Sequence, residues 1–268
     1  MSLNNYEDRI VLFLDILGFR EVHVANTVNN GKDCEGNIAS LYKSLDTMRS
    51  FLNGRLKQKD FFEYRNPSLR VTQFSDSVVI SFINDGNETL LKLIRTIQEL
   101  MVRLIKDGIL CRGAIASGRL IHDGKIIFGP ALNDAYETES KAAIYPRIIF
   151  DKSIIDNGKG EQLFFPEYSP NRIIDNFITR DSDDKYYIDY FPKDLSKYEY
   201  KEIKTYFPQL KYMITNGIVN KKPDVRIKYG WMKNKYNAML DVLKSEDSRK
   251  KMSKRTQLLT YINGLSSI

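Results

Sequence analysis

The sequence contains few of the residues that disulfides and soft metal sites need. Its only two cysteines, Cys34 and Cys111, fit no CxxC or metal-ligand spacing. We therefore expect two free thiols in a reducing compartment. The only two histidines, His23 and His122, are too few for a histidine-rich zinc site. Any bound metal should then be a hard cation held by carboxylates.

Long apolar runs are also missing. No stretch of about 18 uninterrupted apolar residues occurs, so no membrane-spanning segment is expected. The N-terminal sequence MSLNNYEDR lacks the basic patch and apolar core of a signal peptide, which favours a cytoplasmic location. Of the 268 residues, 42% are hydrophobic and 28% are charged, a balance that predicts a folded globular protein and excludes disorder as the main state.

The net charge of +7 is distributed unevenly along the chain. From Lys193 onward there are 17 Lys or Arg against 7 Asp or Glu, whereas the first 192 residues carry 24 against 27. A basic C-terminal region of this kind can attract polyphosphate or nucleic acid. It can equally be the solvated face of lysine-rich helices, and the sequence leaves both interpretations open.

The order of apolar patterns predicts an α+β fold. A buried strand is expected at residues 9–16, and the segment 69–83 should form a hairpin that turns at Ser75-Asp76. Helices are expected at 36–58, 87–106 and 130–141, and further strands at 109–121, 125–128 and 147–150. This order predicts a ferredoxin-like βαββαβ core within a catalytic domain of residues 1–165. Residues 166–268 should form a basic, mainly helical extension, with helices at 229–243 and 254–265 after interruptions at Pro208 and Pro223.

Two aspartates stand inside apolar strand patterns. Asp15 lies in VLFLDILGF and Asp76 lies in TQFSDSVVISF. A carboxylate in such surroundings is unfavourable unless it is hydrogen-bonded, paired or bound to metal. Either aspartate alone could be a turn cap or a locally satisfied buried acid. A ferredoxin-like core can bring the two strand ends together, and two carboxylates about 4 Å apart repel by roughly 4 kcal/mol. A Mg²⁺ or Mn²⁺ ion is the simplest neutraliser, since proteins usually hold Mg²⁺ with one or two carboxylates and substrate phosphates.

Four motifs in this chain resemble those of the class III nucleotidyl cyclases. The segment Phe13–Phe19 is similar to the family's first metal motif, and Ser75-Asp76 to its second metal aspartate. Arg112–Gly118 resembles the Arg-x-Gly-Ile-x-x-Gly strand, and Gly129–Ser140 the helix that begins Gly-x-x-Val-Asn. The resemblance covers roughly residues 9–155, and the four motifs follow one another in the family's order.

The resemblance implies roles for the matching residues. Asp15 and Asp76 would bind two Mg²⁺ or Mn²⁺ ions per site, with the backbone carbonyl of Ile16 as a further ligand. Arg112 would contact the triphosphate, and Asn133 would orient the ribose or stabilise the transition state. Structural alternatives are an ordinary ion pair for Arg112 and a polar helix position for Asn133. The family also implies a homodimer with active sites at its interface, converting a nucleoside triphosphate to a 3′,5′-cyclic nucleotide and pyrophosphate.

The chain departs from the family at the positions that read purines. Thr72 and Ile126 stand where adenylate and guanylate cyclases carry base-reading residues, which makes ATP and GTP poor candidates. Glu137 replaces the transition-state arginine, so the positive charge would have to come from Lys141 or Arg147. Structural alternatives are a solvated helix position for Lys141 and a strand-edge charge for Arg147.

These departures resemble the pyrimidine cyclases of bacterial Pycsar anti-phage systems, as do the AYETES, YPRI and KYGW segments. That resemblance implies synthesis of cyclic UMP or cyclic CMP, with UTP ahead of CTP, and a separate effector protein that senses the product. Thr72, Tyr42 and Tyr64 are candidates for reading the small base. Gly18 and Phe19, at the end of the first motif, complete the expected substrate-binding residues.

Two other functions remain open from the sequence. A catalytically inactive cyclase-like regulator would explain Glu137, although both metal aspartates are present. A nucleic-acid-binding protein would use the basic C-terminal region, and its binding would depend steeply on salt. No specific nucleic acid and no membrane partner are expected.

Overall fold

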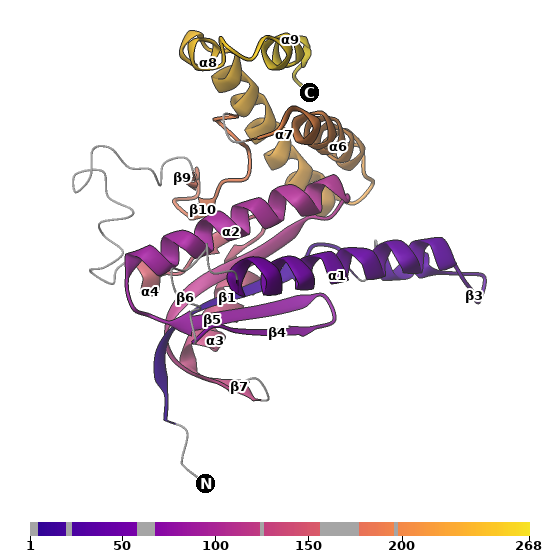
Figure 1. The fold of residues 1–268 in the computed structure, drawn as a ribbon. Coiled ribbons are helices and arrows are strands. Elements are labelled where there is room, and N and C mark those ends of the chain that lie inside the picture. The colour runs from indigo at the N-terminus through magenta and orange to yellow at the C-terminus, as the bar shows by residue number, and fades with distance from the viewer. Residues whose placement is uncertain (1–4, 20–22, 58–67, 124–125, 156–176, 196–197) are drawn as a thin grey trace. The chain divides into compact units, whose positions relative to one another are not determined.

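The computed structural model describes residues 5–19, 23–57, 68–123, 126–155, 177–195 and 198–268. The chain forms two compact units (Figure 1). The first comprises Met1–Leu104 and Ile109–Ile188, and the second comprises Ile105–Gly108 and Asp189–Ile268. The boundary expected at residue 165 falls outside the described residues. The first unit continues to Ile188 because two further short strands join its sheet.

The first unit is built on one eight-stranded sheet in the order β4-β5-β1-β6-β8-β10-β9, with β7 paired to β6. Its strands are β1 (Glu7–Ile16), β4 (Arg70–Phe74), β5 (Ser77–Ile83), β6 (Cys111–His122), β7 (Ile127–Phe128), β8 (Ile148–Phe150), β9 (Ile178–Arg180) and β10 (Tyr186–Ile188). All the pairs are antiparallel except β6 with β8. The order β4-β5-β1-β6, with helices after β1 and β5, is the ferredoxin-like arrangement. The predicted α+β core is confirmed.

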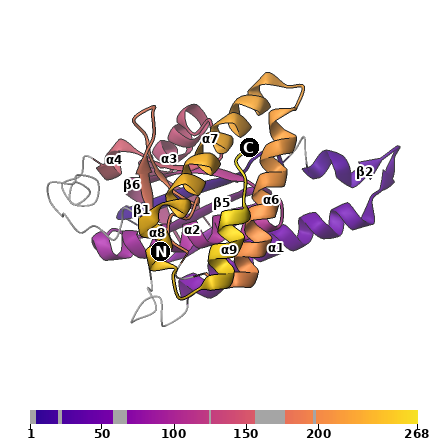
Figure 2. The same cartoon turned by 90° about the horizontal axis from the view of Figure 1, so that it is seen from above.

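Helices cover both faces of this sheet. Figures 1 and 2 together show α1 and α2 on one face and α3 on the other. The described residues of the first unit include the helices α1 (Glu35–Lys57), α2 (Asn87–Lys106, whose last residues belong to the second unit), α3 (Pro130–Ala142) and the short α4 (Lys152–Ile155). A 3₁₀ turn (Val24–Thr27) and the small pair β2 (Val28–Asn29) and β3 (Lys32–Asp33) precede α1.

The central strand β1 is buried on both faces, and its alternation decides where Asp15 lies. Val11 and Phe13 belong to the apolar cluster that packs under Ala131 and Ala135 of α3. Because side chains alternate along a strand, Asp15 lies on this same α3 face. Its direct partners in the neighbouring strands are Ser77 of β5 and Arg112 of β6. The sheet therefore brings the acid and the arginine of two separate sequence motifs side by side.

Glycines allow close approach at two points around this face. At Gly113 an added Cβ would lie 2.5 Å from the carbonyl oxygen of Phe13, closer than real Cβ atoms come to backbone. At Gly129, which precedes α3, φ is +149° and a Cβ would lie 2.6 Å from the carbonyl oxygen of Arg119. Gly113 therefore allows β6 to lie close to β1. Gly129 allows the start of α3 to lie close to β6.

The second unit is helical. It contains α6 (Tyr200–Ile218), α7 (Pro223–Lys244), α8 (Glu246–Lys251) and α9 (Thr256–Gly264). Pro208 lies inside α6, so the predicted interruption there is wrong. A proline inside a helix removes one hydrogen bond at a penalty of about 3 kcal/mol. Burial of apolar side chains along α6, including Phe207 and Leu210, offsets that penalty. Pro223, by contrast, stands at the start of α7, where it is compatible with the first turn.

No helix among the described residues is both long enough and apolar enough to cross a membrane. Cys34 and Cys111 are both free, as the sequence predicted.

Candidate functional site

The ends of β1 and the β4–β5 turn bring the two aspartates together. Asp76 follows Ser75, whose φ of +52° places it in the left-handed region that tight turns use. The amide N–H of Ile16 donates to the carbonyl oxygen of Asp76 across 3.2 Å, which fixes this turn against the end of β1. The hydroxyl of Ser77 donates to Oδ1 of Asp15 across 3.2 Å. The predicted convergence of two acids from separate strands is present.

Asp15 carries the electrostatic signature of a crowded acidic site. Burial, the charge of Asp76 and the charge of Glu139 raise the pKa of Asp15 to about 6, against an opposing effect of Arg112. Its side chain is nevertheless 19% exposed, so a ligand can reach it. Two neighbouring carboxylates form a hard oxygen donor pair of the kind that suits Mg²⁺ or Mn²⁺. Within the described residues, no set of three or more His, Cys, Asp or Glu side chains is arranged to hold a metal.

Arg112 links this acid pair to helix α3. Its Nε lies 2.6 Å from Oε1 of Glu139 and 3.6 Å from Oδ2 of Asp15. The contact with Glu139 is an ion pair without hydrogen-bond geometry. Glu139 is 2% exposed, whereas Arg112 is 29% exposed and can contact a ligand. Glu139 was not among the predicted site residues. Its spacing of four residues after Ala135, and eight after Ala131, is the sequence signal that places it on the buried face of α3.

The other residues predicted on α3 face outward. Asn133 is exposed, as are Glu137 and Lys141. Nζ of Lys141 lies 2.8 Å from Oε2 of Glu137, one helical turn away, in an ordinary surface pair. The contact fits the structural alternative for Lys141, and its catalytic role stays a prediction.

Arg147 lies in a buried ion-pair cluster with the β9–β10 turn. Its side chain is fully buried and pairs with Asp181, and its Nη1 donates to Oδ1 of Asp183 across 3.0 Å. This cluster ties the start of β8 to β9 and β10, two strands that the sequence did not predict. The arrangement favours the structural interpretation of Arg147 over the catalytic one.

The predicted substrate-binding residues lie in different surroundings. Thr72, on β4, is partly buried and its hydroxyl lies 2.8 Å from Nε2 of His122. Gly18 and Phe19 directly follow the Asp15 strand, and Gly18 has a φ of +72°. Tyr42 stands exposed on α1. Tyr64 lies outside the described residues.

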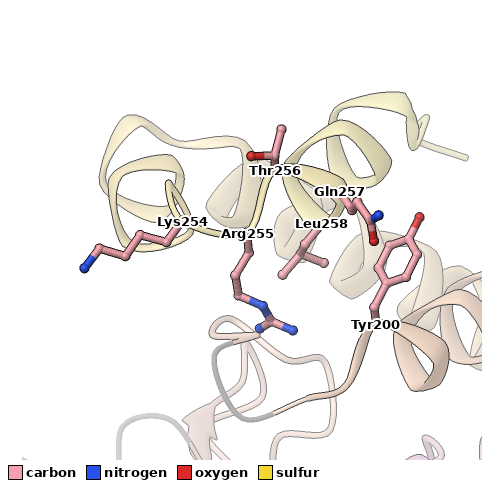
Figure 3. A pocket seen from close by; sticks show the side chains of 6 residues that line it. All are labelled: Tyr200, Lys254, Arg255, Thr256, Gln257 and Leu258. Carbon is pink, nitrogen blue, oxygen red and sulfur yellow. The ribbon is translucent and has the colours of Figure 1, made fainter.

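The second unit has a concave surface of its own. It is lined by Tyr200, Lys254, Arg255, Thr256, Gln257 and Leu258 (Figure 3). Arg255 donates from Nη1 to the carbonyl oxygen of Leu195 and from Nη2 to that of Tyr198, both across 2.6 Å. These bonds hold the chain before α6 and give Arg255 a structural role.

Comparison with known proteins finds no matching family model and no matching curated protein. Similar solved structures are found, including two cyclases. The adenylyl cyclase CyaB from P. aeruginosa is 14% identical, with a TM-score of 0.46 over 69% of this chain and 94% of that chain. The catalytic core of a rhodopsin-guanylyl cyclase with converted specificity, in complex with ATPalphaS, is 17% identical, with a TM-score of 0.42 over 60% and 85%. At such identities and scores, neither likeness decides what this chain does.

The raised pKa of Asp15 predicts how stability changes with pH when no metal is present. The pKa is about 6 in the fold against an ordinary 3.8. Below both values the carboxyl is protonated in the folded and unfolded states alike, so nothing is lost. As pH rises through this window the unfolded chain ionises first, and the folded state loses stability relative to it. Between about pH 4.5 and about pH 7.5 we expect the free energy of unfolding of the wild type to fall relative to that of Asp15→Asn by on the order of 1 kcal/mol. The effect stays this small because the partly exposed carboxylate is screened by solvent.

Urea denaturation of both proteins in a metal chelator, at pH about 4.5 and about 7.5, measures this difference. A difference between wild type and Asp15→Asn that stays constant across the window would show that Asp15 is not electrostatically strained.

Proposed function

We propose that this chain is a nucleotidyl cyclase that converts a pyrimidine nucleoside triphosphate, UTP ahead of CTP, to its 3′,5′-cyclic monophosphate and pyrophosphate. The observation that carries the proposal is the convergence of Asp15, at the end of β1, and Asp76, in the β4–β5 turn, beside Arg112. Burial and the neighbouring acids raise the pKa of Asp15 there. Partly buried like charges are unfavourable for folding, and a role in binding cations accounts for two acids at this place.

Asp15 and Asp76 would hold Mg²⁺ or Mn²⁺, with the main-chain carbonyl of Ile16 as a further ligand. The chemistry that such ions supply when bound is a lowered pKa of the attacking hydroxyl and neutralisation of the leaving pyrophosphate. In the reaction the ribose 3′-oxygen loses its proton and bonds to the α-phosphorus. The bond from that phosphorus to the pyrophosphate oxygen breaks, and the proton goes to solvent.

Arg112 would bind the triphosphate. Its guanidinium offers several N–H donors to phosphate oxygens, and it is exposed enough to do so. The ion pair with the buried Glu139 of α3 keeps the Arg112 side chain beside Asp15. Positioning and electrostatic stabilisation are the main contributions such a site can make to phosphoryl chemistry.

The position of Asn133 supports a site shared by two chains. Asn133 lies six residues before Glu139 on α3, about 9 Å along the helix axis, and its side chain is exposed. Glu139 reaches the acid pair of its own chain, whereas Asn133 faces away from the sheet. A homodimer that places Asn133 of one protomer against the acids of the other would complete both sites, as the family resemblance implies.

The choice of a pyrimidine base is supported by Thr72 and Ile126 at the positions where purine cyclases read the base. A role as second-messenger synthase in anti-phage defence, with a separate effector that senses the product, follows the same resemblance.

The proposal predicts product formation from one class of nucleotide. Purified protein incubated with Mn²⁺ and ATP, GTP, CTP or UTP should release pyrophosphate and a cyclic mononucleotide from a pyrimidine nucleotide. Mass spectrometry of the products identifies the base. No product from any of the four would favour the inactive regulator, and salt-sensitive binding to generic RNA or DNA that survives Asp15→Ala would favour the nucleic-acid-binding alternative.

A further inference from the structure

A chain of buried polar groups runs across the α3 face of the sheet and ends at Thr72. Nε of Arg9 donates to the hydroxyl of Ser81 across 3.0 Å. The Ser81 hydroxyl lies 2.8 Å from Nδ1 of His122, and Nε2 of the same ring lies 2.8 Å from the hydroxyl of Thr72. Arg9, Ser81 and His122 are buried, whereas Thr72 is only partly buried. This series of hydrogen bonds therefore leads from the interior to a partly buried threonine.

Arg9, the first residue of this series of hydrogen bonds, decides which partner donates in each of them. An arginine N–H can only donate, so the Ser81 oxygen accepts from Arg9. The Ser81 proton then needs an acceptor, and Nδ1 of His122 lies within reach. A neutral ring that accepts at Nδ1 carries its proton at Nε2 and donates it to the Thr72 oxygen. The opposite direction would leave the proton of the fully buried Ser81 hydroxyl without a partner, which is unfavourable.

The surroundings of His122 keep its ring neutral. Burial and the positive charges of Arg9 and Arg70 lower the pKa of His122 to about 4, and the opposing effect of Asp123 is smaller. At neutral pH the ring therefore has one donor and one acceptor nitrogen, as the directed chain requires.

Thr72 faces the same side of the sheet as the acid pair. Asp15 pairs with Ser77, Ser77 pairs with Phe74, and Thr72 lies two residues from Phe74 on β4. Two strand spacings and two residues along the strand separate Thr72 from Asp15 by about 12 Å. This separation suits a nucleotide whose phosphates lie at the acids and whose base lies over β4.

We infer that Thr72, with its oxygen already accepting from His122, presents its hydroxyl proton to the substrate base and selects a carbonyl acceptor. Uracil carries a carbonyl oxygen at the ring position where cytosine carries an amino group, which is itself a donor. This series of hydrogen bonds therefore favours UTP over CTP. His122 and Ser81 are positioning residues that act through Thr72. This inference rests on the proposed cyclase function and specifies the substrate for it.

The direction of the chain can be measured without any turnover. Long-range ¹H–¹⁵N spectra of the histidines should show His122 neutral at pH about 7, with its proton on Nε2. Ser81→Ala should remove the preference of the His122 proton for Nε2. Ser117→Ala should not change it, since Ser117 is a buried serine on β6 that bonds to Ser153 instead. A proton on Nδ1, or a charged ring, overturns the inference.

Kinetic constants for the two pyrimidine nucleotides test the selection. Thr72→Val keeps the shape but removes the hydroxyl, so kcat/KM for UTP should fall about tenfold and the UTP-to-CTP ratio should narrow, as expected for one lost hydrogen bond. Thr72→Ser should retain the ratio. Ser81→Ala should also lower the UTP-to-CTP ratio of kcat/KM, but by a smaller factor. Ser117→Ala should leave this ratio at the wild-type value.

The outcomes separate the two levels of the proposal. Pyrophosphate release from CTP in preference to UTP, or an unchanged ratio in Thr72→Val, overturns the selection while the cyclase function stands. No release from any nucleotide by the wild type overturns the cyclase function, and the selection with it, whatever the spectra of His122 show.

Discussion

Asp15→Asn is expected to lower pyrophosphate release at least about 10²-fold, because it removes half of the charge available to divalent ions beneath the triphosphate. Asparagine has nearly the same size as aspartate, so no cavity forms. The folded protein should be no less stable at neutral pH, since the Asp15 carboxylate is disfavoured by burial and by Asp76 and Glu139. Loss of turnover without loss of stability distinguishes a ligand from a structural acid. Asp76→Asn should act in the same way.

Asp8→Asn provides the matched control. Asp8 lies on the same strand, is exposed, and accepts a hydrogen bond from Nδ2 of Asn84 across 3.2 Å. The same chemical change there should leave turnover at the wild-type level. Steady-state pyrophosphate release with Mn²⁺ and UTP, together with thermal unfolding, covers all three variants. Full activity in Asp15→Asn would remove the basis for the cyclase proposal.

The acid pair could be found from sequence because strand alternation carries most of the information. One acid follows the apolar run of β1, and the other stands at a turn between two β-rich runs. Once the hairpin packs beside β1, both acids must lie at the ends of paired strands. The register that places Arg112 opposite Asp15 could not be derived in this way. It depends on the close approach of β6 to β1 at Gly113, a tertiary contact.

Glu139 and the His122 chain show where the sequence was less informative. Glu139 shares the four-residue spacing of Ala131 and Ala135, but a charged residue at such a position normally reads as solvent-exposed. His122 gains its meaning only from Thr72 and Ser81, which lie on different strands and are brought together by the sheet.

The strands β9 and β10 were missed because three residues are too few for a periodic pattern, and the two strands are separated by a charged turn. The equally short β8 could be predicted because Ile148–Phe150 is wholly apolar. The helix α6 was missed for a different reason. Pro208 reads as an interruption, whereas packing of the apolar face of α6 overrides that local preference. In both cases tertiary contacts decided the outcome.

Arg147→Met should destabilise the fold by about 3–5 kcal/mol, because it leaves the carboxylate of Asp181 buried without its charged partner. Methionine retains much of the apolar volume, so the loss reports on charge more than on packing. Urea denaturation measures the effect. Adding Asp181→Asn to Arg147→Met should recover part of the loss, since the uncompensated negative charge is then removed.

Arg180→Met is the control for this prediction. Arg180 belongs to β9, and its Nη2 lies 3.1 Å from Asp184 in an exposed pair. Surface pairs of this kind contribute about 0–1 kcal/mol, so this variant should unfold nearly as the wild type does. The sequence alone allowed Arg147 to replace the missing transition-state arginine. A folded, fully stable Arg147→Met protein without turnover would support that catalytic role. A destabilised protein whose remaining folded fraction still turns over UTP would assign Arg147 to the architecture that holds β8, β9 and β10 together.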